Sequence, residues 1–308
     1  MLAAHKIAFL ESGLLTAALC VVALAVGMLV GGALYTLAWR LTHRRVVLTM
    51  RCRCPECGHP LALREMIPVV SWVLRQGTCE HCGRPISVAY PTSELLGAGI
   101  FASVVLRYGL TAQTCEIAIF AFLLFFVSLT SLWDYSVPNE CILTAVLVRI
   151  AYLVWVFLTE GTYTLAISSL VGFVALGLPL LVAVFLSNAM LVRDMTGFGT
   201  VKLVAVVGLY LGWQQGLLAI GMAFGIGLIV WLVSPNKLMT VEVDGGVEPI
   251  TGEDAQDGEP APLQSRPSRE EDIAEPMRLI PFAPSIALAC WVMLLIGASV
   301  SVWNAPLL

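Results

Sequence analysis

Long apolar segments follow one another along this chain, and they constrain its fold more than any other feature. A helix that crosses a bilayer needs about 20 predominantly apolar residues. Of the 308 residues, 58% are hydrophobic and 12% are charged, whereas a soluble domain carries about 25% charged residues. The composition therefore excludes a soluble globular protein and predicts an all-α, polytopic membrane protein with about eight transmembrane helices. We place the spans at residues 13–39, 92–110, 114–133, 141–159, 163–187, 201–216, 217–234 and 282–303.

The charged residues are segregated into two blocks. Eight of the 17 Lys and Arg residues lie between Arg40 and Arg84, and 11 of the 21 acidic residues lie between Glu242 and Glu275. Basic residues next to spans favour the cytoplasm, so we expect the loop of residues 40–91 to be cytoplasmic. The first apolar stretch is longer than the roughly 7–15-residue core of a signal peptide. We interpret it as an uncleaved first span whose N-terminus lies outside.

The number of spans decides which loops share a face of the membrane. With eight spans, the cytoplasmic connections are residues 40–91, 134–140, 188–200 and 235–281. If the two segments that meet near Gln214 formed one helix, the last of these loops would change sides and the other three would not. The expected regions are a first span (1–39), a cysteine loop (40–91), a helical bundle (92–234), an acidic linker (235–281) and a last span (282–308).

The acidic linker has the composition of a disordered segment. Between Thr240 and Pro276, eleven acidic residues stand against Arg266 and Arg269, with several Pro and Gly and few large apolar residues. Such a segment cannot bury enough apolar surface to fold by itself. We predict a disordered cytoplasmic linker, and solvation explains its charge more simply than specific recognition of a partner.

Two Cys-x-x-Cys pairs lie in the basic loop, and they have the pattern of a zinc site. They are separated by 21 residues, slightly beyond the 15–20 of common zinc ribbons, and each is followed by Gly (Gly58 and Gly83), which permits a tight turn. Four thiolates would leave a tetrahedral ion no open position, so its role would be structural. Reduced thiols without metal, or two disulfides, are the alternatives, although disulfides are rare in the cytoplasm. The predicted ligands are Cys54, Cys57, Cys79 and Cys82.

Two aspartates close to span ends are candidate functional residues. Asp134 ends a strongly apolar run, and an ionisable group at membrane depth suggests a function. Its alternative role is to cap the next helix. Asp194 lies in a polar turn beside Arg193, and a surface ion pair is its simpler interpretation.

Several motifs together resemble the type IV prepilin peptidases, the polytopic aspartic proteases of type IV pilus and type II secretion systems. The resemblance extends from about residue 30 to residue 295 and is interrupted by the acidic segment. The residues that carry it are Arg53-Cys54-Pro-x-Cys57-Gly-His, Ile67-Pro68-Val-Val-Ser71-Trp72, Gly77-x-Cys79-x-x-Cys82-Gly-x-Pro85-Ile86-Ser87, Tyr90-Pro91-x-x-Glu94-Leu95-Leu96, Gly197-Phe198-Gly199-x-x-Lys202-Leu203, Gly212-Trp213 and Ile280-Pro281-Phe282-Ala283-Pro284.

The resemblance implies a function and one cofactor. In that family, two Asp residues cut a leader peptide from single-span prepilin or pseudopilin substrates at the cytoplasmic side of the bacterial inner membrane. It implies further that the enzyme can methylate the new N-terminus with S-adenosylmethionine. A zinc ion on the four cysteines fits the same picture, the lipid bilayer is the expected surrounding, and no nucleic-acid partner is expected.

The catalytic motifs are where this chain departs from the family. Thr200 follows Gly197-Phe198-Gly199, at the position of the family's second Asp, and a hydroxyl does not titrate near neutral pH. The first motif is about three residues shorter between Asp134 and Pro138 than in the family, so either Asp134 or Ser131 occupies the first catalytic position, and we favour Asp134. Asp194 is a possible substitute for the missing carboxylate.

Three functions remain open from the sequence. The first is a prepilin-type endopeptidase that uses Asp134. The second is a degenerate or engineered inactive relative, with Thr200 in place of Asp, that binds prepilin-like subunits without cutting them. The third is a transporter that uses Asp134, although no inverted repeats are visible.

Overall fold

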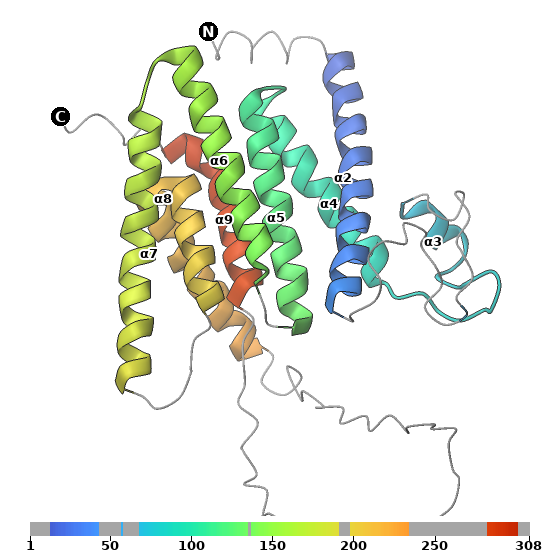
Figure 1. Ribbon diagram of the computed structural model, residues 1–308. Coiled ribbons are helices and arrows are strands. Elements are labelled where there is room, and N and C mark those ends of the chain that lie inside the picture. Colours follow the sequence, from blue (N-terminus) through green and yellow to red (C-terminus); the bar gives the residue numbers. More distant parts are fainter. Residues whose placement is uncertain are drawn as a thin grey trace, which may run out of the picture. The chain divides into compact units, whose positions relative to one another are not determined.

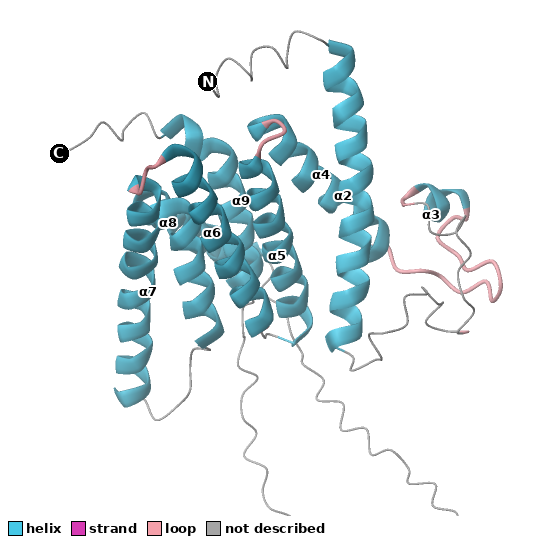
Figure 2. Cartoon of the chain, turned by 45° about the horizontal axis from the view of Figure 1, so that its top comes forward, coloured by secondary structure: helices cyan, strands magenta, loops and turns pink. Residues whose placement is uncertain are grey.

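The computed structural model describes residues 13–42, 57, 68–134, 137–190, 198–233 and 282–300. The regular elements within these residues are all helices (Figures 1 and 2). They are α2 (Gly13–Thr42), α3 (Val70–Leu74), α4 (Ala89–Tyr108), α5 (Ala112–Asp134), α6 (Asn139–Glu160), α7 (Thr164–Met190), α8 (Phe198–Val233) and α9 (Phe282–Val300).

These helices confirm the predicted all-helical membrane fold. Among the described residues, six helices are long and apolar enough to cross a membrane, and the apolar part of α9, Phe282–Gly297, is shorter. Helices suit the bilayer core because it contains no water to hydrogen-bond the backbone, and a helix makes all its backbone hydrogen bonds within its own segment. Six of the eight predicted spans correspond to α2, α4, α5, α6, α7 and α9.

The other two predicted spans are the two arms of α8, which folds back on itself. Gly212 interrupts the helix with φ 73° and ψ 178°, a conformation that a residue without Cβ adopts at low cost. A Cβ on Gly216 would lie 3.7 Å from the Cα of Gly208, whereas residues eight apart in a straight helix are about 12 Å apart. The break between the two segments is thus at Gly212, slightly before the predicted Gln214.

Glycines allow two pairs of helices to approach closely. A Cβ on Gly27 of α2 would lie 2.5 Å from the carbonyl oxygen of Gly97 on α4. Gly172 of α7 makes the same kind of backbone contact with Gly208 of α8. Small residues serve this purpose in membranes, where close van der Waals packing replaces the hydrophobic effect between helices.

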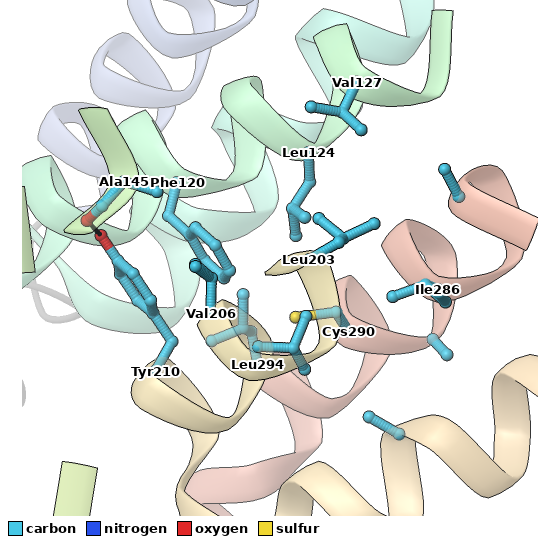
Figure 3. Close-up of a cluster of buried hydrophobic side chains, with 14 of the residues drawn as sticks. Phe120, Leu124, Val127, Ala145, Leu203, Val206, Tyr210, Ile286, Cys290 and Leu294 are labelled. Carbon is cyan, nitrogen blue, oxygen red and sulfur yellow. Dashed lines mark hydrogen bonds between the residues drawn. The ribbon is translucent and has the colours of Figure 1, made fainter. Parts of the chain in front are cut away.

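The core of the bundle joins α5, α8 and α9 (Figure 3). The rings of Phe120 and Tyr210 are stacked with their centroids 3.7 Å apart, and Leu203, Val206 and Cys290 pack in the same cluster. The hydroxyl of Tyr210 donates a hydrogen bond of 2.9 Å to the carbonyl of Ala145, which ties α8 to α6.

The chain divides into two units, one of Met1–Gly227 with Pro281–Leu308, and one of Leu228–Ile280. The end of α8 is the described part of the second unit. The acidic segment for which we predict disorder lies outside the described residues.

Candidate functional site

Three of the four predicted zinc ligands lie together. The sulfur atoms of Cys57, Cys79 and Cys82 are all within 4.8 Å of one another. Zinc–sulfur bonds of about 2.3 Å in a tetrahedron put the sulfur atoms about 3.8 Å apart, so this cluster could hold one metal ion. Cys54, the fourth predicted ligand, lies outside the described residues.

A tight turn brings the second pair of thiols to one place. The amide of Gly83 donates to the carbonyl of Cys79 at 2.8 Å, and the amide of Cys79 donates to the carbonyl of Arg84 at 2.9 Å. Gly83 has φ +68°, a left-handed conformation that favours glycine. Its part in the turn agrees with the expectation from the sequence, while its counterpart Gly58 lies outside the described residues.

The carboxylate of Glu94 anchors this cysteine module (Cys57 and residues 68–88) on α4. Its Oε2 accepts a hydrogen bond of 2.6 Å from the amide of Val69. Val69 has φ 58°, which is an outlier for a β-branched residue and costs free energy. Inside the module, the indole of Trp72 donates to the carbonyl of Ile86 at 3.1 Å. The Glu94 carboxylate therefore holds a strained backbone at the junction of module and membrane helix.

An aromatic cluster joins the start of α4 to the end of α5. The ring of Tyr35 on α2 lies edge-on to Tyr90 at 4.7 Å and to Trp133 at 5.3 Å between centroids. Trp133 immediately precedes Asp134, the last residue of α5. The cluster thus brings the helix that follows the cysteine module next to the helix end that carries Asp134, whose side chain is not among those described.

The segment that follows α5 meets the first turn of α8. A Cβ on Gly199 would lie 3.1 Å from the Cβ of Val137, and the Nζ of Lys202 donates a hydrogen bond of 2.9 Å to Oδ1 of Asn139. Thr200 lies between these two contacts and is partly buried. Asp194 and Gly197, the other candidates in this region, lie outside the described residues.

The side chains of Thr200 and Lys202 can bind and polarise, but the hydroxyl of Thr200 supplies no acid or base near neutral pH. The hydroxyl of Thr200 can donate and accept a hydrogen bond without titrating, and Lys202 adds a positive charge. Ser131, the alternative to Asp134, is 4% exposed and lies one helical turn inside α5. Asp134 is the last residue of α5.

Sequence reasoning missed a buried pair of charged side chains in the bundle and two polar contacts between distant segments. Glu116 and Arg149 lie within predicted spans and form a buried ion pair. Each is a charged residue within an apolar segment, which is the signal that could have found them. For Glu94 and Asn139, whose partners are 25 and 63 residues away, the sequence carries no signal of pairing.

Comparisons with known proteins point to one family. The protein-family model of the bacterial peptidase A24 N-terminal domain matches residues 25–108 of this chain. A prepilin leader peptidase/N-methyltransferase of Myxococcus xanthus is 28% identical over 301 residues, which cover 88% of each chain. Its counterpart in Bacillus subtilis is 30% identical over 186 residues, which cover 60% of this chain and 71% of the relative. One from Aeromonas hydrophila is 26% identical over 266 residues, 83% of this chain and 75% of the relative. No solved structure matches the chain.

Proposed function

The chain belongs to the prepilin leader peptidase/N-methyltransferase family, and on this basis we propose that it cleaves the leader of prepilin-like membrane proteins. The substrate is a single-span helix with a basic leader, which enters from the lipid so that the scissile bond reaches the end of α5. We place this reaction at the cytoplasmic face of the bacterial inner membrane, with the cysteine module and the acidic linker on the same side.

One contact supports this proposal more than any other, namely that between the segment after α5 and the first turn of α8. The proximity of Val137 to Gly199 and the hydrogen bond between Asn139 and Lys202 hold the two motif-bearing segments together. The residues that meet in this contact are far apart in the sequence, so it is the tertiary fold that brings them together. In an aspartic protease, the two catalytic groups must lie close enough to act on one water molecule and one peptide bond.

The proposed chemistry assigns separate roles to Asp134 and Thr200. Asp134 is the general base, which removes a proton from the attacking water. In a two-carboxylate site the second group stays protonated, because close like charges separate the two pKa values, and it protonates the substrate. Thr200 can donate a hydrogen bond to the scissile carbonyl from this position but cannot transfer its proton at neutral pH. The loss of one acid or base group lowers the rate by about 10²–10⁴-fold.

The same substitution favours a second candidate function, which is binding of prepilin-like subunits without cleavage. The Gly197-Phe198-Gly199 sequence before Thr200 fits the family motif, whereas the Asp that would complete the catalytic pair is replaced by Thr200 at this position. A chain of this kind would hold the substrate helix and leave its leader in place.

Cleavage assays with three forms of the protein distinguish the two functions. Membranes that contain the natural chain, Asp134→Ala or Thr200→Asp are mixed with a prepilin, and release of the leader is measured. Cleavage by the natural chain that disappears in Asp134→Ala supports the slow protease. Cleavage that appears only in Thr200→Asp supports the binding function. Cleavage by Asp134→Ala at the natural rate would contradict the assignment of Asp134, and Thr200→Ser is the matched control.

We propose that Cys54, Cys57, Cys79 and Cys82 hold a structural zinc ion. The three described thiols fit this role because they converge on one point and offer soft sulfur ligands. A zinc ion bound there would clamp the module without taking part in proteolysis. We also propose methyl transfer from S-adenosylmethionine, which rests on the name of the relatives alone, and we assign no residue to it.

A further inference from the structure

A buried ion pair lies at the end of α5 opposite Asp134. The guanidinium of Arg149 on α6 donates to Oε1 of Glu116 on α5 at 2.7 Å, and the two side chains are 7% and 3% exposed. Arg149 also donates to the hydroxyl of Ser169 on α7 at 2.8 Å. Glu116 and Asp134 are 18 residues apart on one helix, which corresponds to about 27 Å. This charge pair is thus remote from the proposed catalytic end.

The protein alone does not complete the hydrogen bonding of this pair. Among the described residues, neither the second carboxylate oxygen of Glu116 nor Nε of Arg149 has a hydrogen-bond partner. The Arg149 guanidinium lies over the ring of Tyr210 at 5.2 Å. A charged group inside a membrane bundle is costly unless it is fully paired or adjoins a polar space.

A cavity of about 300 Å³ adjoins the ion pair, and we call it the polar cavity because charged and amide-bearing residues contribute to its otherwise apolar lining. Besides Glu116 and Arg149, its lining includes Gln113, Gln215 and Tyr152. This volume corresponds to roughly ten water molecules, so it is large enough for a small polar group.

The cavity lies at the end of the bundle where several helices turn, which is the level at which we expect lipid headgroups. Its lining includes Tyr108, the last residue of α4, Gln113 in the first turn of α5 and Gly212 at the turn of α8. The turn between α4 and α5 and the turn between α6 and α7 lie at the same end, the upper one in Figure 1. A polar group that enters here would come from the end of the bundle opposite Thr200.

An apolar hollow of about 230 Å³ lies next to the polar cavity, between α6 and α7. Leu165 lines both spaces. The hollow is formed by aliphatic and aromatic side chains such as Ile150, Leu153 and Phe157, with Tyr163 at the turn between the two helices. A polar space and an apolar space that share a wall match a ligand with a polar head and an apolar chain.

We propose that the two spaces together bind one zwitterionic phospholipid of the phosphatidylethanolamine type. Its ammonium group pairs with the Glu116 carboxylate, and its phosphate oxygens accept hydrogen bonds from Arg149 and the Gln113 amide. One acyl chain fills the hollow that begins at Leu165. Because Glu116 and Arg149 together carry no net charge, the site favours a headgroup with both charges over an anionic headgroup.

Lipid retention by the purified full-length protein tests the headgroup part of this proposal. The protein is extracted from vesicles with equal amounts of phosphatidylethanolamine and phosphatidylglycerol, and the bound lipid is identified by native mass spectrometry. We expect one phosphatidylethanolamine per chain, with at least about a 10-fold preference over phosphatidylglycerol. The double variant Glu116→Leu/Arg149→Leu removes both charges without leaving one unpaired, and it should lose this preference. Equal retention of the two lipids by the natural chain, or an unchanged preference in the double variant, would overturn the proposal.

A substitution in the hollow tests the acyl-chain part. Ala166→Phe fills the hollow and should reduce retention about 10-fold, whereas Ala151→Phe on the exposed surface of α6, outside both spaces, should leave it unchanged. Soluble phosphorylethanolamine, which has the headgroup but no chains, should displace less than a tenth of the bound lipid. Complete displacement, or equal retention by both variants, would show that the hollow does not bind the lipid chain. These readouts do not involve leader cleavage, so they stand apart from the proposed protease.

Discussion

The cysteine module and the helical bundle differ in how much apolar surface each of them buries. Among the described residues of the module, Cys79 is the one hydrophobic side chain that is buried, at 4% exposed, and α3 buries none of its residues. The bundle buries large side chains completely, such as Phe120 at 1%, Leu203 at 2% and Val207 at 0%. A small module with so little core is expected to depend on a metal ion for its stability, whereas the bundle depends on packing.

Removal of metal should therefore unfold the module and leave the bundle intact, and this is the largest effect that we predict. Structural zinc contributes about 10–16 kcal/mol in small zinc domains. After treatment with a chelator, limited proteolysis should cut the chain within residues 68–88, while circular dichroism should show nearly unchanged helix content.

A matched pair of cysteine variants sharpens this prediction. Cys79→Ser should lower the zinc content per chain, whereas Cys290→Ala, at a cysteine that is 0% exposed in the bundle core, should not. Cooperative loss of the membrane helices on chelation, or a module that resists proteolysis without metal, would contradict the difference between the two regions.

Breaking the buried ion pair should have the next largest effect, and it acts on the bundle. Arg149→Leu leaves the Glu116 carboxylate buried without its partner, which costs about 3–5 kcal/mol of unfolding free energy. The double variant Glu116→Leu/Arg149→Leu should lie close to the natural chain, because replacing both charges by apolar groups is often neutral. Denaturant unfolding in detergent micelles measures both, and a double variant as unstable as the single one would refute the explanation.

A smaller effect is expected where the module is attached to the bundle. Glu94→Ala removes the acceptor for the amide of Val69, and a hydrogen bond to a charged group contributes about 1.5–3 kcal/mol. Hydrogen exchange at the Val69 amide should become faster, and chelators should remove metal more quickly. Glu140→Ala, at an exposed position in the first turn of α6, is the control. Unchanged exchange at Val69 would show that Glu94 does not hold this junction.

The smallest effect on stability is expected for Lys202→Met. The hydrogen bond of Lys202 to Asn139 is exposed, so its loss should cost about 0.5–1 kcal/mol. The rate of leader cleavage should fall by a larger factor than this loss of stability explains, because the contact positions the segment after Asp134 against α8. Parallel measurements of unfolding and cleavage separate the two quantities, and a fall in stability alone would make Lys202 a structural residue only.

Much of the helical architecture could be predicted because it depends on local composition. The apolar segments predicted α2, α4, α5, α6, α7 and α9, and a break close to Gly212 in α8. The spacing of the cysteines predicted that Cys57, Cys79 and Cys82 would converge. The predicted break in α8 lies about two residues after the observed one. The sequence of α8 contains many glycines, and only one of them has a left-handed φ.

The candidate site was less predictable because its contacts join distant segments. Val69 and Glu94 are 25 residues apart, Glu116 and Arg149 are 33 apart, and Asn139 and Lys202 are 63 apart. No local pattern shows which donor meets which acceptor over such distances. The roles of Asp134 and Thr200 in catalysis stay predictions, as does the zinc ion.

The amino-acid sequence by itself determined that this chain forms membrane helices, where they begin and end within a few residues, and that its cysteines can gather around one ion. These properties follow from apolar length, charge and short spacing, which act within a segment or a single turn. Only the tertiary structure decided that Glu116 meets Arg149, that Glu94 holds Val69 and that a polar cavity adjoins an apolar hollow at Leu165. Such contacts depend on how whole helices pack side by side, and glycines such as Gly27 and Gly97 permit the close approach of α2 and α4.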